Sequence, residues 1–207
     1  MKQALTTMLE MQDRMNTRVH PQWVHQQFAW YRAIWIECGE LIEHYGYKWW
    51  KQQQPDMAQV QLEVIDIWHF GMSALFRESD APQDVTETIL QQLEGYVPTG
   101  AGVREATEAL ALETLRSHSF SAPHFWDLMA AVELDFDVLY RAYVGKNVLN
   151  FFRQDHGYQE GTYLKDWGGR EDNEHLVEIT DGMDCQAEDF ADALYQALLQ
   201  RYAEFSR

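Results

Sequence analysis

Hydrophobic residues recur along most of this 207-residue chain at intervals of three and four, the spacing of one face of an α-helix. The segments with this spacing are rich in Leu, Ala, Met, Glu and Gln, which favour helices, and the alternation typical of strands is hard to find. Prolines and short polar junctions separate them. The pattern predicts helices at residues 22–46, 57–78, 83–95, 102–118, 124–156 and 186–205, and an irregular Gly-rich stretch at 157–169. We therefore expect an all-α fold, a helical bundle.

The composition predicts one folded domain. Hydrophobic residues make up 46% of the chain and aromatic residues 14%, enough for a sizeable core, so we expect residues 1–207 to form a single all-α domain. Only Cys38 and Cys185 are present, which is too few for a disulfide framework and is typical of a reducing compartment. No apolar run is long enough for a signal peptide or a membrane span. The predicted location is the cytoplasm, with no membrane partner.

The charge excludes some partners. Lys and Arg number 16 against 33 Asp and Glu, a formal net charge of −17. Such a chain repels bare nucleic acid and anionic membrane surfaces, so we expect no nucleic-acid partner. A polyanionic ligand would need a local basic site or a bridging cation.

Two pairs of carboxylates suggest where such a cation could bind. Glu37 and Glu40 lie in "ECGELIEHYGYKWWK", and Glu63 and Asp66 lie in "EVIDIWHF". On a helix, each pair flanks an apolar stripe at the same relative angles. A carboxylate that faces an apolar interior loses its hydration and needs a partner. Several carboxylates around one point are typical of a hard cation, so we predict a site for Mg²⁺ or Mn²⁺.

A di-iron carboxylate site is an alternative, because such sites also use Glu residues on bundle helices and add carboxylate-x-x-His motifs. Asp66 and His69 come close to this motif. The other carboxylate followed three residues later by His is Asp172 with His175, in a polar segment that we do not expect to face a bundle core. Carboxylates three residues apart also arise by chance in an acidic helical chain.

The two carboxylate motifs, taken together, resemble those of the dimeric dUTPases of the all-α nucleoside triphosphate pyrophosphatase superfamily. The segment "EMQDRMN" near the start resembles the first motif of that family, and "YRAYVGKNVLNFFRQDHGYQEGTYLKDWGGREDN" resembles its last. The resemblance covers residues 12–70 and 140–173, whereas residues 71–139 match only in helical character. The aromatic loop of the family commonly reads Trp-Lys-Trp-Trp-Lys, and Tyr47 takes the first place here.

The resemblance implies an enzyme that hydrolyses dUTP, and also dUDP, to dUMP by attack of water on the β-phosphorus. It implies Mg²⁺, with Mn²⁺ as a substitute, held by all four carboxylates. Glu40, Glu63 and Asp66 would be ligands, and Glu37 would also orient and deprotonate the water. It further implies a homodimer in which the partner chain contributes phosphate contacts.

The resemblance also implies which residues bind the base. Gln12 and Asn16 carry amides that can read a uracil edge. Trp50 and Phe70 would form aromatic walls, with His69 beside them. The neighbouring Trp49 is predicted to belong to the core instead.

Other residues are expected at the sugar and the phosphates. Asp66 and Asn147 would meet the 3′-hydroxyl, and Lys48 and Lys51 would lie near the triphosphate. The phosphate contacts implied by the last motif are Lys146, Arg153, Tyr158 and Lys165.

Two alternatives concern the function. Because side-chain amides can flip to serve uracil or cytosine, the chain could act on dCTP as well as dUTP, or more broadly on nucleoside triphosphates. A non-catalytic acidic binding module is the second alternative. Such a module would not need basic residues beside a carboxylate cluster.

Overall fold

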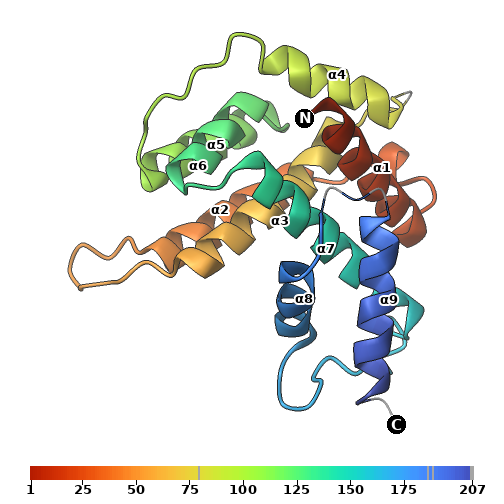
Figure 1. The fold of residues 1–207 in the computed structure, drawn as a ribbon. Coiled ribbons are helices and arrows are strands. Elements are labelled where there is room, and N and C mark those ends of the chain that lie inside the picture. Colours follow the sequence, from red (N-terminus) through yellow and green to blue (C-terminus); the bar gives the residue numbers. More distant parts are fainter. Residues whose placement is uncertain (79, 186, 188, 206–207) are drawn as a thin grey trace. The chain divides into compact units, whose positions relative to one another are not determined.

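The structure of the protein is a computed structural model that describes residues 1–78, 80–185, 187 and 189–205. These residues form nine α-helices and one 3₁₀ helix, and they contain no strand apart from an isolated bridge between Asp166 and Glu171 (Figure 1). The prediction of an all-α fold is confirmed. No helix in the described part of the chain is both long and apolar enough to cross a membrane.

The chain divides into two compact units, Met1–Leu139 and Tyr140–Arg207. The prediction that residues 1–207 behave as a single domain stays a prediction. The elements of the first unit are α1 (Lys2–Val19), η1 (Trp23–Gln26), α2 (Trp30–Tyr45), α3 (Met57–Leu75), α4 (Pro82–Gln92), α5 (Val103–Ser117), α6 (Ala122–Ala131) and the start of α7 (Phe136–Asp155). The second unit holds the rest of α7, α8 (Asp172–Asp181) and α9 (Phe190–Ala203).

Helix α3 is at the centre of the first unit. Its N-cap Asp56 accepts a hydrogen bond from the backbone N–H of Gln59, which satisfies one of the amide groups left over at a helix start. The helix is apolar nearly all round because it packs against both α2 and α1. Trp68, which is fully buried, stacks on Phe125 of α6 with ring centroids 5.0 Å apart. This packing holds the carboxylates of α3 in place.

Several predicted boundaries were wrong. Residues 22–29 form the 3₁₀ helix η1 and a loop in which Gln27 has a φ of 50°, so α2 starts only at Trp30. The predicted helix at 124–156 is broken between α6 and α7, where Glu133 has a φ of 55°. Helices α1 and α8 were not among the predicted segments. The Gly-rich stretch at 157–169 is irregular, as predicted.

An aromatic core supports the second unit. The ring of Phe152 on α7 lies within 6.1 Å of Trp167 and 5.4 Å of both Tyr195 and Tyr202, measured between centroids. The last two rings come from α9, which also packs against α8. Aromatic side chains bury large areas, which explains how a short unit with much irregular backbone forms a core of its own.

Candidate functional site: a carboxylate cluster beside a polar network

The packing of α2 against α3 brings three carboxylates together. Glu37 of α2 meets Glu63 and Asp66 of α3, with one oxygen of each within 4.8 Å of the others. Figure 1 shows the two helices side by side. In the described part of the chain, this is the one group of three or more His, Cys, Asp or Glu residues close enough to share a metal ion.

The electrostatics of the cluster favour a bound cation. Burial, followed by the charges of Asp66, Glu40 and Glu63, raises the pKa of Glu37 to about 7. Burial and the charge of Asp66 also raise the pKa of Glu63, whose side chain is almost completely enclosed. Like charges in a poorly hydrated place disfavour the ionised forms, and a divalent cation would reverse this. The carboxylate oxygens present here are the donors that hard divalent cations prefer.

Glu40 and His44 surround this cluster. Glu40 is exposed and does not join the group of three, although its charge contributes to the raised pKa of Glu37 and Glu63. His44 Nε2 lies 3.4 Å from Glu63 Oε1. Sequence reasoning missed His44, but its position one turn after Glu40 on the same face of α2 could have indicated it.

A second polar group joins α1 to α3. Gln12 and Asn16, one turn apart on α1, are buried, and both donate from their amide nitrogens to Ser73 Oγ, at 3.0 and 2.9 Å. Gln12 Oε1 faces His69 Nδ1 at 3.1 Å. Three residues predicted to contact the base thus lie in one hydrogen-bonded network. Ser73 was not predicted, because a lone Ser within an apolar helix gives no signal in the sequence.

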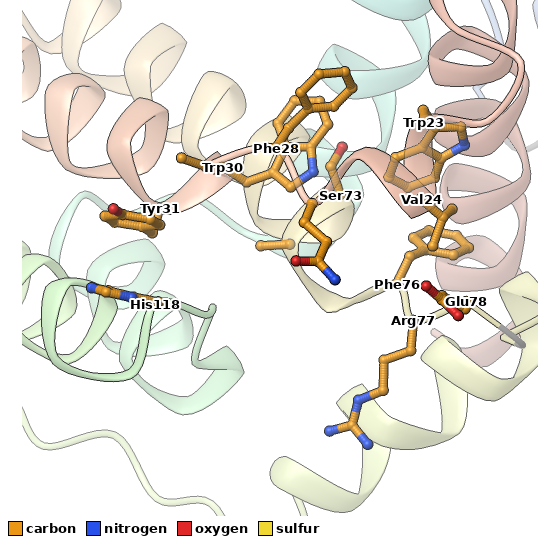
Figure 2. Close-up of a pocket in the computed structure, with 13 residues that line it drawn as sticks. Trp23, Val24, Phe28, Trp30, Tyr31, Ser73, Phe76, Arg77, Glu78 and His118 are labelled. Carbon is orange, nitrogen blue, oxygen red and sulfur yellow. The ribbon is translucent and has the colours of Figure 1, made fainter.

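A pocket of about 640 Å³ opens beside this network (Figure 2). Ser73 lines it, and Tyr31 and His118 stack on each other in its wall with centroids 4.2 Å apart. None of the predicted substrate residues lines it. Phe70 stacks on Trp30, another residue of the wall, at 6.2 Å. The full lining consists of Trp23, Val24, Gln27, Phe28, Ala29, Trp30, Tyr31, Ser73, Ala74, Phe76, Arg77, Glu78 and His118.

The aromatic loop between α2 and α3 is exposed. Trp50 is 60% exposed and Trp49 90% exposed, so the prediction that Trp49 belongs to the core was wrong. The loop extends beyond the ends of both helices (Figure 1). Lys48 pairs with Glu43 at 2.5 Å, and Lys51 is exposed.

The predicted phosphate and sugar contacts of the last motif belong to the second unit. Arg153 is bound by both its Nε and Nη2 atoms to Asp172, each at 2.8 Å. Lys165 pairs with Glu171 at 3.1 Å, while Tyr158 is half-exposed and Lys146 partly exposed on α7.

Asn147 is completely buried in the same unit, on α7. It donates from Nδ2 to the Tyr143 hydroxyl at 3.2 Å, and its Oδ1 has no hydrogen-bond partner among the described residues.

The expectation that Asp172 and His175 avoid a core was wrong. Asp172 is fully enclosed and His175 nearly so. Besides Arg153, the hydroxyl of Tyr163 donates to Asp172, and His175 Nε2 lies 3.0 Å from the carbonyl oxygen of Trp167. A polar segment can be buried when partners from elsewhere satisfy it. These bonds, rather than an ion, account for the buried Asp172.

Comparison with known proteins decides the family. A sequence model of the dUTPases matches residues 4–158, three quarters of the chain. The chain belongs to the dUTPase family. This dUTPase is accordingly a dUTP diphosphatase, a hydrolase of nucleotide metabolism, of the all-α type. No curated protein matches the chain. The matched region contains the carboxylate cluster and the Gln12 network, and the di-iron and binding-module alternatives are not favoured.

The raised pKa values make the stability of the metal-free dUTPase depend on pH. Folded Glu37 keeps its proton up to a pH of about 7, whereas the unfolded chain loses it near 4.5. The folded state therefore binds more protons between these values, and the free energy of unfolding falls as the pH rises from about 4.5 to 7. In EDTA, we expect the melting temperature to fall over this range.

A divalent cation that binds only the folded site should restore this stability, by roughly 2.7 kcal/mol at a hundred times its dissociation constant. Thermal melts in EDTA and in Mg²⁺ between pH 5 and 8 measure this. Glu37→Gln should flatten the EDTA profile, while Glu108→Gln, at an exposed carboxylate of α5, should leave it unchanged. An EDTA profile that rises toward pH 7 would contradict the assignment.

Proposed function

We propose that this dUTPase hydrolyses dUTP to dUMP and pyrophosphate, and dUDP to dUMP and phosphate, with Mg²⁺ as its cofactor and Mn²⁺ as a substitute. The observation that carries the proposal is the meeting of Glu37, Glu63 and Asp66 in a chain of the dUTPase family. Three clustered carboxylates, two of which, Glu37 and Glu63, have a raised pKa, suit a cation that also binds phosphate oxygens.

Glu63, Asp66, Glu40 and Glu37 would hold the cation. A bound Mg²⁺ would neutralise charge on the phosphates and favour attack by water. Glu37 would orient that water and take its proton. Burial and the neighbouring carboxylates raise the pKa of Glu37 to about 7 in the metal-free cluster, and a bound cation would favour the ionised form that can accept a proton. His44 would orient Glu63 through their contact at 3.4 Å.

The remaining predicted residues are proposed to bind the nucleotide. Gln12, Asn16 and His69 would read the base, supported by their shared network. Trp50 would close over it from the exposed loop, opposite Phe70. Asn147, whose Oδ1 has no hydrogen-bond partner among the described residues, and Asp66 would meet the 3′-hydroxyl, as the resemblance implies. The proposed phosphate contacts are Lys48, Lys51, Lys146, Arg153, Tyr158 and Lys165.

The proposed assembly is a homodimer, which rests on the resemblance to the dimeric dUTPases. The proposed location is the cytoplasm, with no nucleic-acid or membrane partner, in keeping with the net charge of −17. Residues 1–207 are proposed to act as one domain.

Formation of the monophosphate from the common nucleoside triphosphates and from dUDP, each with Mg²⁺, with Mn²⁺ and with EDTA, tests the function. We expect dUMP to accumulate from dUTP and dUDP with either metal, and the rate to vanish in EDTA. Hydrolysis that is unaffected by chelation would contradict the metal-dependent mechanism, and dUTP left intact would contradict the activity itself.

A further inference from the structure

Ser73 is the centre of the polar network between α1 and α3. Its side chain is almost fully buried, and its Oγ accepts from Gln12 Nε2 at 3.0 Å and Asn16 Nδ2 at 2.9 Å while it donates to the carbonyl oxygen of His69 at 3.1 Å. A serine hydroxyl has one proton and two lone pairs. All three are used in these bonds.

This saturation determines which way both amides point. The proton of Ser73 goes to the His69 carbonyl, so Ser73 can only accept from the amides, and a nitrogen of each must face it. If the Asn16 amide were flipped, its oxygen would lie against Ser73 Oγ and its nitrogen would lie against Gln12 Nε2, two repulsive contacts. The observed orientation is the one in which every group has a complementary neighbour.

The orientation extends to His69. The two N–H groups of Gln12 go to Ser73 and to Asn16 Oδ1, the latter at 3.1 Å. Its Oε1 therefore faces His69 Nδ1, at 3.1 Å, and can only accept. Nδ1 must carry a proton for this contact to be a hydrogen bond.

Asn16 has one N–H and one oxygen lone pair in addition to its bonds with Ser73 and Gln12. The network determines on which side of the Asn16 amide the free N–H lies and on which side the free lone pair lies. Uracil presents a carbonyl at C4 beside a protonated N3, which complements a donor beside an acceptor. Cytosine presents an amino group beside a bare N3, so both positions are reversed. An amide held in one orientation therefore distinguishes the two bases, whereas a freely flipping amide does not.

We propose that Ser73 is a positioning residue that locks the amides of Gln12 and Asn16, and so holds Asn16 in the orientation that pairs with uracil and opposes cytosine. The inference rests on the proposed function, since it assumes that these amides read the base. Ser73 also lines the pocket of Figure 2, so the buried network borders that pocket at this residue.

The test compares Ser73→Ala with Thr86→Val. Thr86 is also a fully buried hydroxyl, bonded to Thr6 at 3.0 Å and to the carbonyl oxygen of Pro82, and it takes no part in the network. We expect Ser73→Ala to lower the ratio of kcat/KM for dUTP to that for dCTP at least about tenfold, the equivalent of one hydrogen bond. Thr86→Val should leave this ratio unchanged.

A third substrate, dTTP, distinguishes a loss of amide orientation from a general loss of base selectivity. Thymine differs from uracil at C5, away from the edge that the amide reads, so the ratio for dUTP to dTTP should stay within about threefold in Ser73→Ala. Unchanged selectivity against dCTP, an equal loss of both ratios, or a wild-type enzyme that uses dCTP as well as dUTP would overturn the proposal.

Histidine ring NMR tests the orientation without any activity. Long-range ¹H–¹⁵N correlation spectra, with His69 assigned from the spectrum of a His69→Gln variant, should show a proton on Nδ1 in the wild type. A proton on Nε2 alone would overturn the proposal. If the wild type hydrolyses no dUTP, the proposed function fails, and this spectrum still decides how the network is oriented.

Discussion

Glu63→Gln should lower kcat/KM for dUTP at least about a hundredfold, a loss of roughly 2.7 kcal/mol of transition-state stabilisation. Glu63 is the most enclosed of the three clustered carboxylates, and its Oε1 lies 3.4 Å from His44 Nε2. An amide keeps its size but carries no charge, so it binds a divalent cation poorly. Asp66→Asn should have a comparable effect. Steady-state kinetics over a range of Mg²⁺ concentrations measure both.

The fold should survive Glu63→Gln. Removal of one like charge from the metal-free cluster relieves repulsion, so the melting temperature in EDTA should stay the same or rise. Glu108→Gln, at an exposed carboxylate of α5, is the matched control and should keep full activity. Full activity of Glu63→Gln would exclude the cluster as the metal site. A variant that unfolds would indicate a structural role for Glu63.

Arg153→Met should lower the free energy of unfolding by about 3 kcal/mol. The Arg153 side chain is 14% exposed and binds Asp172, which is fully buried, through two hydrogen bonds. Without Arg153, the main remaining partner of the Asp172 carboxylate is the hydroxyl of Tyr163, which donates a hydrogen bond to it. A buried charge that has lost its ionic partner is strongly destabilising. Urea denaturation of the two proteins measures the difference.

Arg170→Met is the matched control. Arg170 pairs with Glu178 at 2.8 Å and Glu174 at 3.5 Å, but its side chain is 44% exposed, so the change should cost less than about 1 kcal/mol. Replacing Arg153 and Asp172 together by Met and Asn should restore part of the stability, because no buried charge remains. If Arg153→Met abolishes activity without loss of stability, Arg153 serves the phosphates and the Asp172 pair contributes little.

Much of the carboxylate cluster could be predicted from local spacing. A helix repeats every 3.6 residues, so the positions of Glu37, Glu63 and Asp66 beside apolar stripes follow from the sequence once both segments are helical. That the two stripes pack on each other is a tertiary fact, and it placed Glu40 outside the group of three. The missed His44 shows the same limit, because its contact with Glu63 depends on how two helices meet.

Burial of polar groups was the least predictable feature. Asp172 lies in a segment of charged residues, and only partners 9 and 19 residues away, Tyr163 and Arg153, make its burial favourable. Trp49 lies in an aromatic run, yet it is 90% exposed, in a loop that extends past the ends of α2 and α3. Hydrophobicity describes what a side chain prefers, whereas exposure depends on which surfaces are available to cover it.

The sequence by itself determined that this chain is helical, that it is acidic, and that its carboxylate motifs resemble those of the dimeric dUTPases. Periodicity, charge and motif spacing depend only on the amino acids and their order along the chain. The tertiary structure alone decided that Ser73 bonds Gln12, 61 positions earlier, and Asn16, 57 positions earlier, and so orients both amides. A single hydroxyl among apolar residues leaves no periodic signal. Its effect depends on two amide partners that the packing of α1 on α3 brings within hydrogen-bonding distance, while its third partner, the carbonyl oxygen of His69, lies one turn earlier on α3.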